Sequence, residues 1–304
     1  MSNFNNSDLF LEPKTTQHGS HMIMSNVNRP KKNKFINIDT RFRDEYNYLQ
    51  NANYNITLPE RITEVKTMKL TNIEIPMSFY NISANLGNNC FKVTTGGNSS
   101  MVIIPDGNYT ATTLSTAINN AISALGSPYS NLKYEYSSDL SGGSVLYSSS
   151  GSITVEFAVT STGQPDKYNV KSKLGWLLGF RNIIYTVTVT HTVSESFVDL
   201  NGSRYLYLAI DEFNKGNQNS FVSPLATSLI NKNIIGRISM DANQFGYGTI
   251  LPANRYNGFL ISDCRSYTGK IDLLKLNVQL LNENGINMAM NGMDFSFCLE
   301  VEHE

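Results

Sequence analysis

The sequence predicts a mainly β protein, an antiparallel β-sandwich or barrel that contains one clear α-helix. Short segments of alternating apolar and polar residues follow one another closely, and Gly, Asn and Pro separate them. Only one segment carries a convincing helical stripe of apolar residues. A chain with one good helix does not alternate strands and helices as a parallel sheet requires.

The first predicted strands lie in the N-terminal quarter of the chain. Residues 35–39 alternate apolar and polar positions, and residues 40–44 follow as a charged turn. Residues 54–59 form a second alternating strand that stops at its proline, and residues 65–75 form a longer one that Pro76 ends.

A hairpin and the helix come next. The strands 91–94 and 101–104 flank a turn that contains Gly96 and Gly97. After a tight turn at 105–109, Thr110 or Thr112 can cap a helix that Gly126 and Pro128 end. The predicted apolar stripe of this helix is Leu114, Ala117, Ile118, Ala121, Ile122 and Leu125.

β signals dominate the rest of the chain. The further predicted strands are 145–147, 153–159, 183–193, 205–210, 234–240, 259–261, 273–281 and 295–301.

Charged residues are few. They make up 16% of the chain, against roughly 25% in typical soluble domains, and Asn, Ser, Thr and Tyr take their place. A weakly charged polar surface suits contact with other subunits, because charge is costly to desolvate. An AT-rich genome would give the same composition without any physical demand.

The N-terminal segment 1–33 is predicted to be a flexible basic arm. Residues 1–34 carry a net charge of +3, and the remainder therefore carries −4. This balance disfavours a nucleic-acid-binding fold with a strongly basic face. The basic group of the arm is Arg29, Lys31, Lys32 and Lys34. It acts as a solvated linker or, in a shell protein, contacts the genome or another subunit weakly.

The three cysteines predict neither disulfides nor zinc binding. Cys90, Cys264 and Cys298 form no CxxC pair, and we expect them to be buried small apolar residues in a reducing compartment. No apolar run is long enough to span a bilayer, and no secretory signal pattern begins the chain.

Candidate catalytic residues are few. His191 lies in a predicted strand without a nucleophile motif, and we expect it on the polar face. The acidic pairs Asp211 with Glu212, and Asp39 with Asp44, could serve glycoside hydrolysis, but solvated strand-end charges are the favoured interpretation. No catalytic, cofactor-binding or metal-binding residue is therefore assigned.

Residues 174–180 contain the only tryptophan, Trp176. They could line a ligand pocket. The favoured interpretation is an apolar plug in which glycines let chain segments approach closely.

Several motifs together resemble one family. They are residues 35–44, 68–76, 104–109 with the following helix, 174–180, 276–285 and 290–297. These segments are similar to penton and minor capsid proteins of nucleocytoplasmic large DNA viruses, the giant viruses of mimivirus and phycodnavirus kind.

The resemblance implies a jelly-roll domain over residues 34–304, with an inserted α+β subdomain around 90–200. It implies a structural role in the virion capsid, as the penton at the vertex or as a minor component, after synthesis in the host cytoplasm. The implied partners are further copies of the chain, as a pentamer in the penton case, the major capsid protein and other minor capsid proteins. It brings no catalytic residues and no cofactor.

Two other functions stay open at this point. A carbohydrate- or receptor-binding β-sandwich, of fibre or lectin type, would suit the abundant Tyr and Asn, although calcium-ligand clusters are absent from the sequence. An enzyme on a β scaffold would need a concentrated acidic or nucleophilic pocket.

Overall fold

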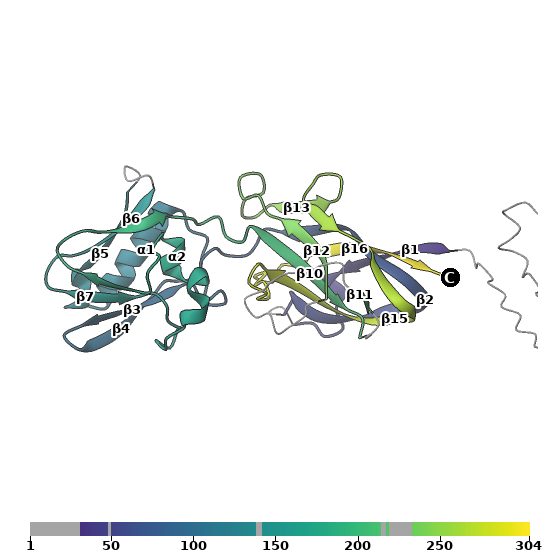
Figure 1. Cartoon of the computed structure of the whole chain (residues 1–304), viewed down its shortest axis with the longest axis horizontal. Coiled ribbons are helices and arrows are strands. Elements are labelled where there is room, and N and C mark those ends of the chain that lie inside the picture. Colours follow the sequence, from purple (N-terminus) through teal and green to yellow (C-terminus); the bar gives the residue numbers. More distant parts are fainter. Residues whose placement is uncertain (1–30, 48–49, 138–141, 214–216, 219–232) are drawn as a thin grey trace, which may run out of the picture.

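The structure is a computed structural model that describes residues 31–47, 50–137, 142–213, 217–218 and 233–304. Figure 1 shows two lobes beside each other along the longest axis, joined by two chain segments. We call them the sandwich lobe, which holds the N- and C-terminal strands, and the inserted lobe, which holds the elements from β3 to β9. All but the last three residues of the predicted arm, 1–33, lie outside the described residues.

Among the described residues of the sandwich lobe, the secondary structure is β apart from one short 3-10 turn, η2. Its elements are β1 (Lys32–Asp39), η2 (Thr40–Phe42), β2 (Asn53–Pro76), β10 (Tyr205–Asp211), β11 (Asn217–Gln218), β12 (Ile234–Ser239), β13 (Ile250–Asn254), β14 (Leu260–Ser262), β15 (Arg265–Asn282) and β16 (Ser296–His303).

The long strand β2 changes partners along its length. From Asn53 to Ile62 it pairs with the C-terminal part of β15. From Val65 to Glu74 it pairs with β16 on one side. On the other side it pairs with the N-terminal part of β15 as far as Met68 and with β13 near its end. Glu64, with a φ of 57°, lies where the two halves meet. The two halves of β2 therefore belong to different layers.

The pairing gives the strand order of a jelly roll. One layer runs β1, β16, second half of β2, β13, and the other runs first half of β2, β15, β10, β12, with β14 beyond. When β2 is counted as two strands and the short strands β11 and β14 are left out, the eight remaining strands, numbered along the chain, lie in the orders 1-8-3-6 and 2-7-4-5, all antiparallel. The predicted fold class, a mainly β antiparallel jelly-roll sandwich with one clear helix, is confirmed.

Both layers of the sandwich contribute to one core. Ile38 of β1, Ile73 of β2, Leu208 of β10 and Val278 of β15 are all at most 1% exposed and belong to one apolar cluster. Burial of such side chains is the main source of stability for a two-layer β fold.

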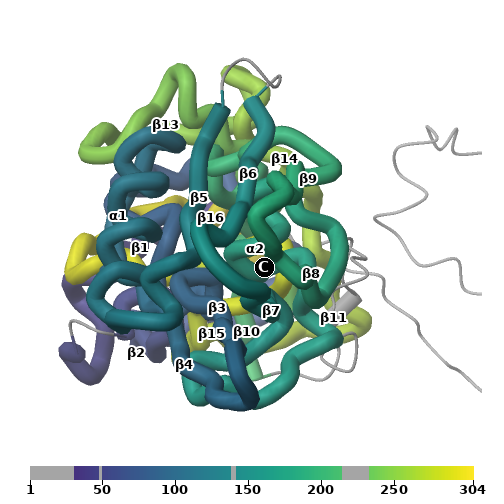
Figure 2. The backbone as a smooth tube through the Cα atoms, turned by 90° about the vertical axis from the view of Figure 1, so that its left-hand side faces the viewer, coloured from purple at the N-terminus to yellow at the C-terminus, as the bar shows by residue number. Residues whose placement is uncertain are grey.

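The inserted lobe has a separate core. Its elements are β3 (Cys90–Thr95), β4 (Asn98–Ile103), α1 (Ala111–Ala124), η3 (Tyr129–Asn131), β5 (Leu132–Ser137), β6 (Gly143–Ser148), β7 (Ile153–Glu156), η5 (Lys167–Ser172), α2 (Leu174–Leu177), β8 (Ile184–Val187) and β9 (Thr192–Phe197). Two antiparallel sheets, β4-β3-β7-β8 and β5-β6-β9, share this core with α1. Figure 2 views this lobe from its outer end, with α1 on the flank opposite β8 and β9.

The predicted helix and hairpin are confirmed. Thr110 caps α1 in a capping box with Thr113, and three residues of the predicted stripe, Leu114, Ile118 and Ile122, are buried. β3 and β4 pair around Gly96 and Gly97, both with positive φ.

Two strand predictions are wrong, one in where the strand ends and one in the number of strands. β2 continues through Pro59, because its pairing with β15 is irregular between Thr57 and Ile62 and the ladder does not need a donor there. The predicted strand 183–193 is two strands, β8 and β9, which pair with β7 and β6 in different sheets.

Candidate contact surfaces

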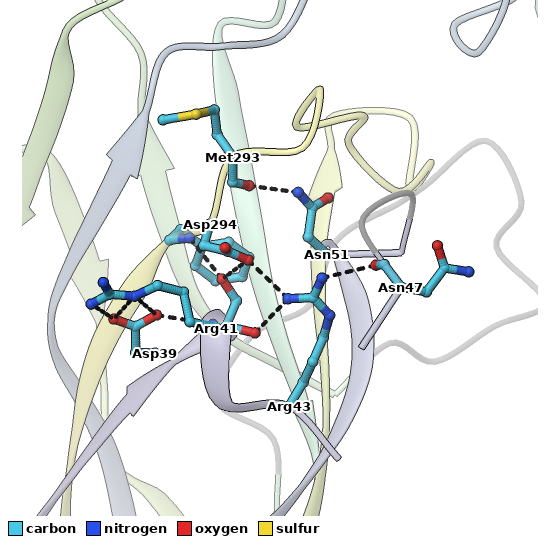
Figure 3. A network of polar contacts seen from close by, with 9 residues as sticks. Asp39, Arg41, Arg43, Asn47, Asn51, Met293 and Asp294 are labelled. Atoms are coloured by element: carbon cyan, nitrogen blue, oxygen red, sulfur yellow. Dashed lines mark hydrogen bonds and ion pairs between the residues drawn. The ribbon is translucent and has the colours of Figure 1, made fainter. Parts of the chain in front are cut away.

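Hydrogen bonds connect the charged turn after β1 to the rest of the sandwich lobe (Figure 3). The Arg43 side chain is 1% exposed. Its Nη1 donates to Thr40 O at 2.5 Å and to Asp294 Oδ1 at 2.8 Å, and its Nη2 donates to Asn47 O at 2.8 Å. Thr40 Oγ1 also accepts from Phe295 N at 2.9 Å. This network holds the start of β16 against the turn.

The two candidate carboxylates near this turn are engaged in structure. Asp39 accepts from Arg41 N at 2.9 Å, and the Arg41 guanidinium, at 2.6 Å, holds the pKa of Asp39 below its usual value. Asp44 accepts from Thr57 N at 2.7 Å and Thr57 Oγ1 at 2.8 Å. Asp39 therefore caps η2, and Asp44 connects the turn to β2.

The second candidate pair is also structural, but the predicted solvation of Glu212 is wrong. Its side chain is fully buried and lies 2.7 Å from Arg265 Nη1, which is 1% exposed. Arg265 donates further to Ile210 O and Asn233 O, at 2.8 and 2.6 Å. Asp211 stays at the strand end, where it accepts from Phe213 N. Such a buried pair needs these added hydrogen bonds to offset desolvation.

His191 lies between β8 and β9, exposed, with its ring centroid 4.8 Å from that of Tyr147. The prediction of a strand position is therefore wrong, because the chain bends at Thr188–Thr190 to change sheets.

The plug interpretation of residues 174–180 is confirmed. A Cβ on Gly175 would stand 2.3 Å from the Phe157 ring, and a Cβ on Gly179 would stand 2.0 Å from Ser196 O. Only glycine allows these approaches. Trp176 lies half-buried beside them.

The cysteines are all free among the described residues. Cys90 is buried, which raises the pKa of its thiol, and Cys298 is half-buried. The predicted burial is wrong for Cys264, which is exposed.

Across the described ranges, no group of three or more His, Cys, Asp or Glu residues could hold a metal ion. Within the same ranges, no helix has the length and apolar character to cross a membrane.

Two of the four basic residues of the predicted arm are neutralised within the chain. Lys31 pairs with Glu302 at 2.9 Å, and Lys34 pairs with Glu60. Lys32 begins β1, and Arg29 lies outside the described residues.

The sandwich lobe carries an apolar groove of about 310 Å³ between the edge strand β1 and the first half of β2, which we call the edge groove. Phe35 and Phe42 stand at it, 65% and 73% exposed. The remaining apolar lining is Ile36, Ile38, Ile56, Leu58, Pro59 and Ile62. Exposed aromatic side chains beside an unpaired strand edge are typical of protein contact surfaces.

A second hollow of about 610 Å³ lies where β2 ends and β13 begins. Ile250 and Met293 are exposed there, at 61% and 50%, and Asp39 and Glu74 add acidic groups to the lining. Sequence patterns did not indicate either hollow, because each joins residues that are far apart in the chain.

Comparisons with known proteins give structural matches alone. No family model and no curated protein matches the sequence. The crystal structure of the mavirus penton protein matches with 7% identity over 91% of this chain and 100% of that chain, with a TM-score of 0.45. A cryo-EM structure of the Sputnik virophage matches with 11% identity over 90% and 98%, with a TM-score of 0.35. At these values the matches add no argument about function.

Proposed function

We propose that this chain is a structural protein of a large DNA virus capsid, either the penton at the vertex or a minor capsid component. It acts by self-association and by contact with the major capsid protein. The observation that carries the proposal is the jelly-roll sandwich whose edge strand β1 lies beside an apolar groove with two exposed phenylalanines.

An open strand edge and an apolar groove both favour contact with another chain. β1 has no partner on its outer side among the described strands, and such edges bind other chains unless they are protected. Head-to-tail contacts of one surface with another form rings when the rotation between neighbouring subunits closes, as a pentamer requires. A stable contact needs on the order of 800 Å² per partner, with aromatic residues near its centre.

We also propose that the chain has no reactive centre. The candidate acids Asp39, Asp44 and Glu212 are each committed to hydrogen bonds or ion pairs that hold the fold. The working unit under this proposal is residues 34–304, with the subdomain around 90–200 inserted in it, and its place is the virion.

Replacement of the two groove phenylalanines tests the proposal. We expect the unmodified chain, alone or with the major capsid protein, to form assemblies heavier than its 33.9 kDa in light scattering. We expect Phe35→Ser with Phe42→Ser to reduce assembly without lowering the melting temperature, because both rings are mostly exposed.

The matched control is Tyr168→Ser with Tyr256→Ser, which removes two rings that are 98% and 99% exposed elsewhere. Assembly should survive this control. Monomers under every condition, or equal loss in both double variants, would contradict the proposed groove contact.

One observation favours carbohydrate binding as a second candidate function. A polar hollow of about 390 Å³ is lined by Asn53, Asn55, Asn85, Asn277 and Asn287, and Asn277 Nδ2 donates within it to Asn53 Oδ1 and Asn55 Oδ1. Amides pair well with sugar hydroxyls because each has donors and an acceptor. Saturable binding on a glycan array that Asn55→Ala abolishes would favour this candidate over the capsid role.

A further inference from the structure

The two lobes are connected by two short linkers, and each linker is anchored on both sides. Residues 79–80 form the first linker and residues 201–203 the second. Outside the linkers, the lobes contact each other through a long hydrogen bond, 3.4 Å, from Asn85 Nδ2 to Asn287 O. Lobes with separate cores, joined by two linkers and by this one direct hydrogen bond among the described residues, are expected to move relative to each other.

On the side of the inserted lobe, Asn81 holds both chain segments. Its Nδ2 donates to Tyr109 O at 2.8 Å and to Leu200 O at 3.0 Å, and its Oδ1 accepts from Tyr109 N at 2.9 Å. Asp199 N adds a hydrogen bond of 2.8 Å to Leu177 O. From these residues on, both segments belong to the inserted lobe.

On the side of the sandwich lobe, Ser78 and Arg204 are the anchors. Ser78 Oγ donates to Met290 O, and Asn291 Nδ2 donates to Ser78 O, both at 2.6 Å. Arg204 O accepts from Met240 N at 2.9 Å.

The first linker is held on the sandwich lobe as far as Tyr80, because Phe79 packs against the core of that lobe. Tyr80 stacks on Tyr247 of the sandwich lobe, with centroids 6.0 Å apart, so rotation is left to the Tyr80–Asn81 step. In the second linker, Gly202 has a φ of +75° and no neighbour within 4 Å of an added Cβ. An exposed ion pair, Asp199 with Arg204 at 3.1 Å, spans this linker and resists rotation only weakly.

Crevices beside the linkers leave room for rotation. One has a volume of about 350 Å³ and the other, the small crevice, of about 70 Å³, and Gly202 and Ser203 line both. The small crevice is lined by Lys171 from the inserted lobe and by Glu283 from the sandwich lobe.

These two charges face a common space without an ion pair in the described part of the chain. Glu283 Oε2 is buried and has no hydrogen-bond partner there. The Lys171 ammonium lies 5.9 Å from the Trp176 ring. A buried carboxylate oxygen without a partner is costly, and an approaching ammonium would relieve that cost.

We propose that the inserted lobe rotates on the sandwich lobe about the Tyr80–Asn81 step and the 201–203 linker. Rotation that narrows the small crevice brings Lys171 to Glu283, and their ion pair holds the closed arrangement. The chain thus alternates between an open and a closed orientation of its lobes. This rotation does not depend on the proposed capsid function.

Distance distributions between spin labels test this rotation. Labels are placed at Tyr168→Cys, 98% exposed in the inserted lobe, and Ile286→Cys, 38% exposed beside the small crevice. Cys264 and Cys298 are replaced by Ser, and buried Cys90 is kept. A pair within the inserted lobe, Tyr168→Cys with Ile103→Cys, gives the width expected of a rigid body.

We expect the label pair across the lobes to show a wider distance distribution than the pair within the inserted lobe. Part of that distribution should be a short-distance population, which represents the closed orientation. Lys171→Glu should reduce that population about 1.5- to 5-fold, the range for an ion pair open to solvent, and Lys171→Glu with Glu283→Lys should restore it. A cross-lobe distribution as narrow as the control would overturn the rotation. An unchanged population in Lys171→Glu, or no recovery in the double reversal, would overturn the ion pair.

Discussion

The two lobes achieve stability in different ways. In the sandwich lobe, the long strands β2 and β15 run through both layers, and the buried ion pairs Arg43–Asp294 and Arg265–Glu212 connect segments far apart in the chain. The inserted lobe instead relies on short strands, one capped helix and glycines that allow close approach of the backbone.

This difference predicts how each lobe responds to destabilising substitutions. Because β2 and β15 are shared between layers, the sandwich lobe should unfold as one unit, and a local change should affect all of it. The inserted lobe has its own core and should unfold separately. The only tryptophan, Trp176, lies in the inserted lobe, so its fluorescence reports on that lobe alone.

The largest expected effect comes from Arg265→Met. It leaves the Glu212 carboxylate buried without its partner, which costs about 3–5 kcal/mol of the unfolding free energy. In denaturant titrations the loss should appear in circular dichroism and leave the midpoint of Trp176 fluorescence in place. Arg61→Met is the control, because its side chain is 60% exposed and should change little. Equal shifts in both signals would show that the lobes unfold together.

The next largest effect is expected from Gly179→Ala in the inserted lobe. The added Cβ would meet Ser196 O at 2.0 Å, and the backbone has a φ of +92°. We expect a loss of about 1–3 kcal/mol in the transition that Trp176 fluorescence reports. Gly151→Ala is the control, because Gly151 has a φ of +73° but open space around it. This variant measures the cost of the backbone conformation alone, so its loss of unfolding free energy should be smaller. A larger loss in Gly151→Ala would refute the close-approach explanation.

Acid should produce the smallest effect, again in the inserted lobe. Lys173, 6% exposed and 2.8 Å from Asp166, lowers the pKa of that carboxyl by a hydrogen bond. A lowered pKa in the folded state means that the stabilisation is complete above the ordinary value of 3.8 and is lost as the pH falls below it. At pH values below 4, the denaturant midpoint of the Trp176 fluorescence transition should therefore decrease more steeply with falling pH in the unmodified chain than in Asp166→Asn. Parallel pH profiles would contradict this assignment.

Local patterns predicted local structure well. The cap at Thr110, the stripe of α1 and the Gly96-Gly97 hairpin depend on neighbouring residues, and the structure confirms each. The passage of β2 through Pro59 and the burial of Glu212 depend on partners in β15, more than fifty residues away in sequence. No periodicity of the single sequence specifies such pairing.

Sequence patterns also gave no indication of the edge groove. Phe42 lies in a motif noted for its family resemblance, but its exposure beside the edge groove depends on how β1 and β2 are placed. The pivot between the lobes arises from hydrogen bonds of Asn81 and Ser78, residues without any distinctive pattern around them.

The most direct test of the proposed capsid role is mass spectrometry of virions purified from a large DNA virus whose genome carries this sequence. We expect the chain to be present after washing and protease treatment, at a constant ratio to the major capsid protein. A chain found in infected cells but absent from the particles would contradict the proposed capsid role.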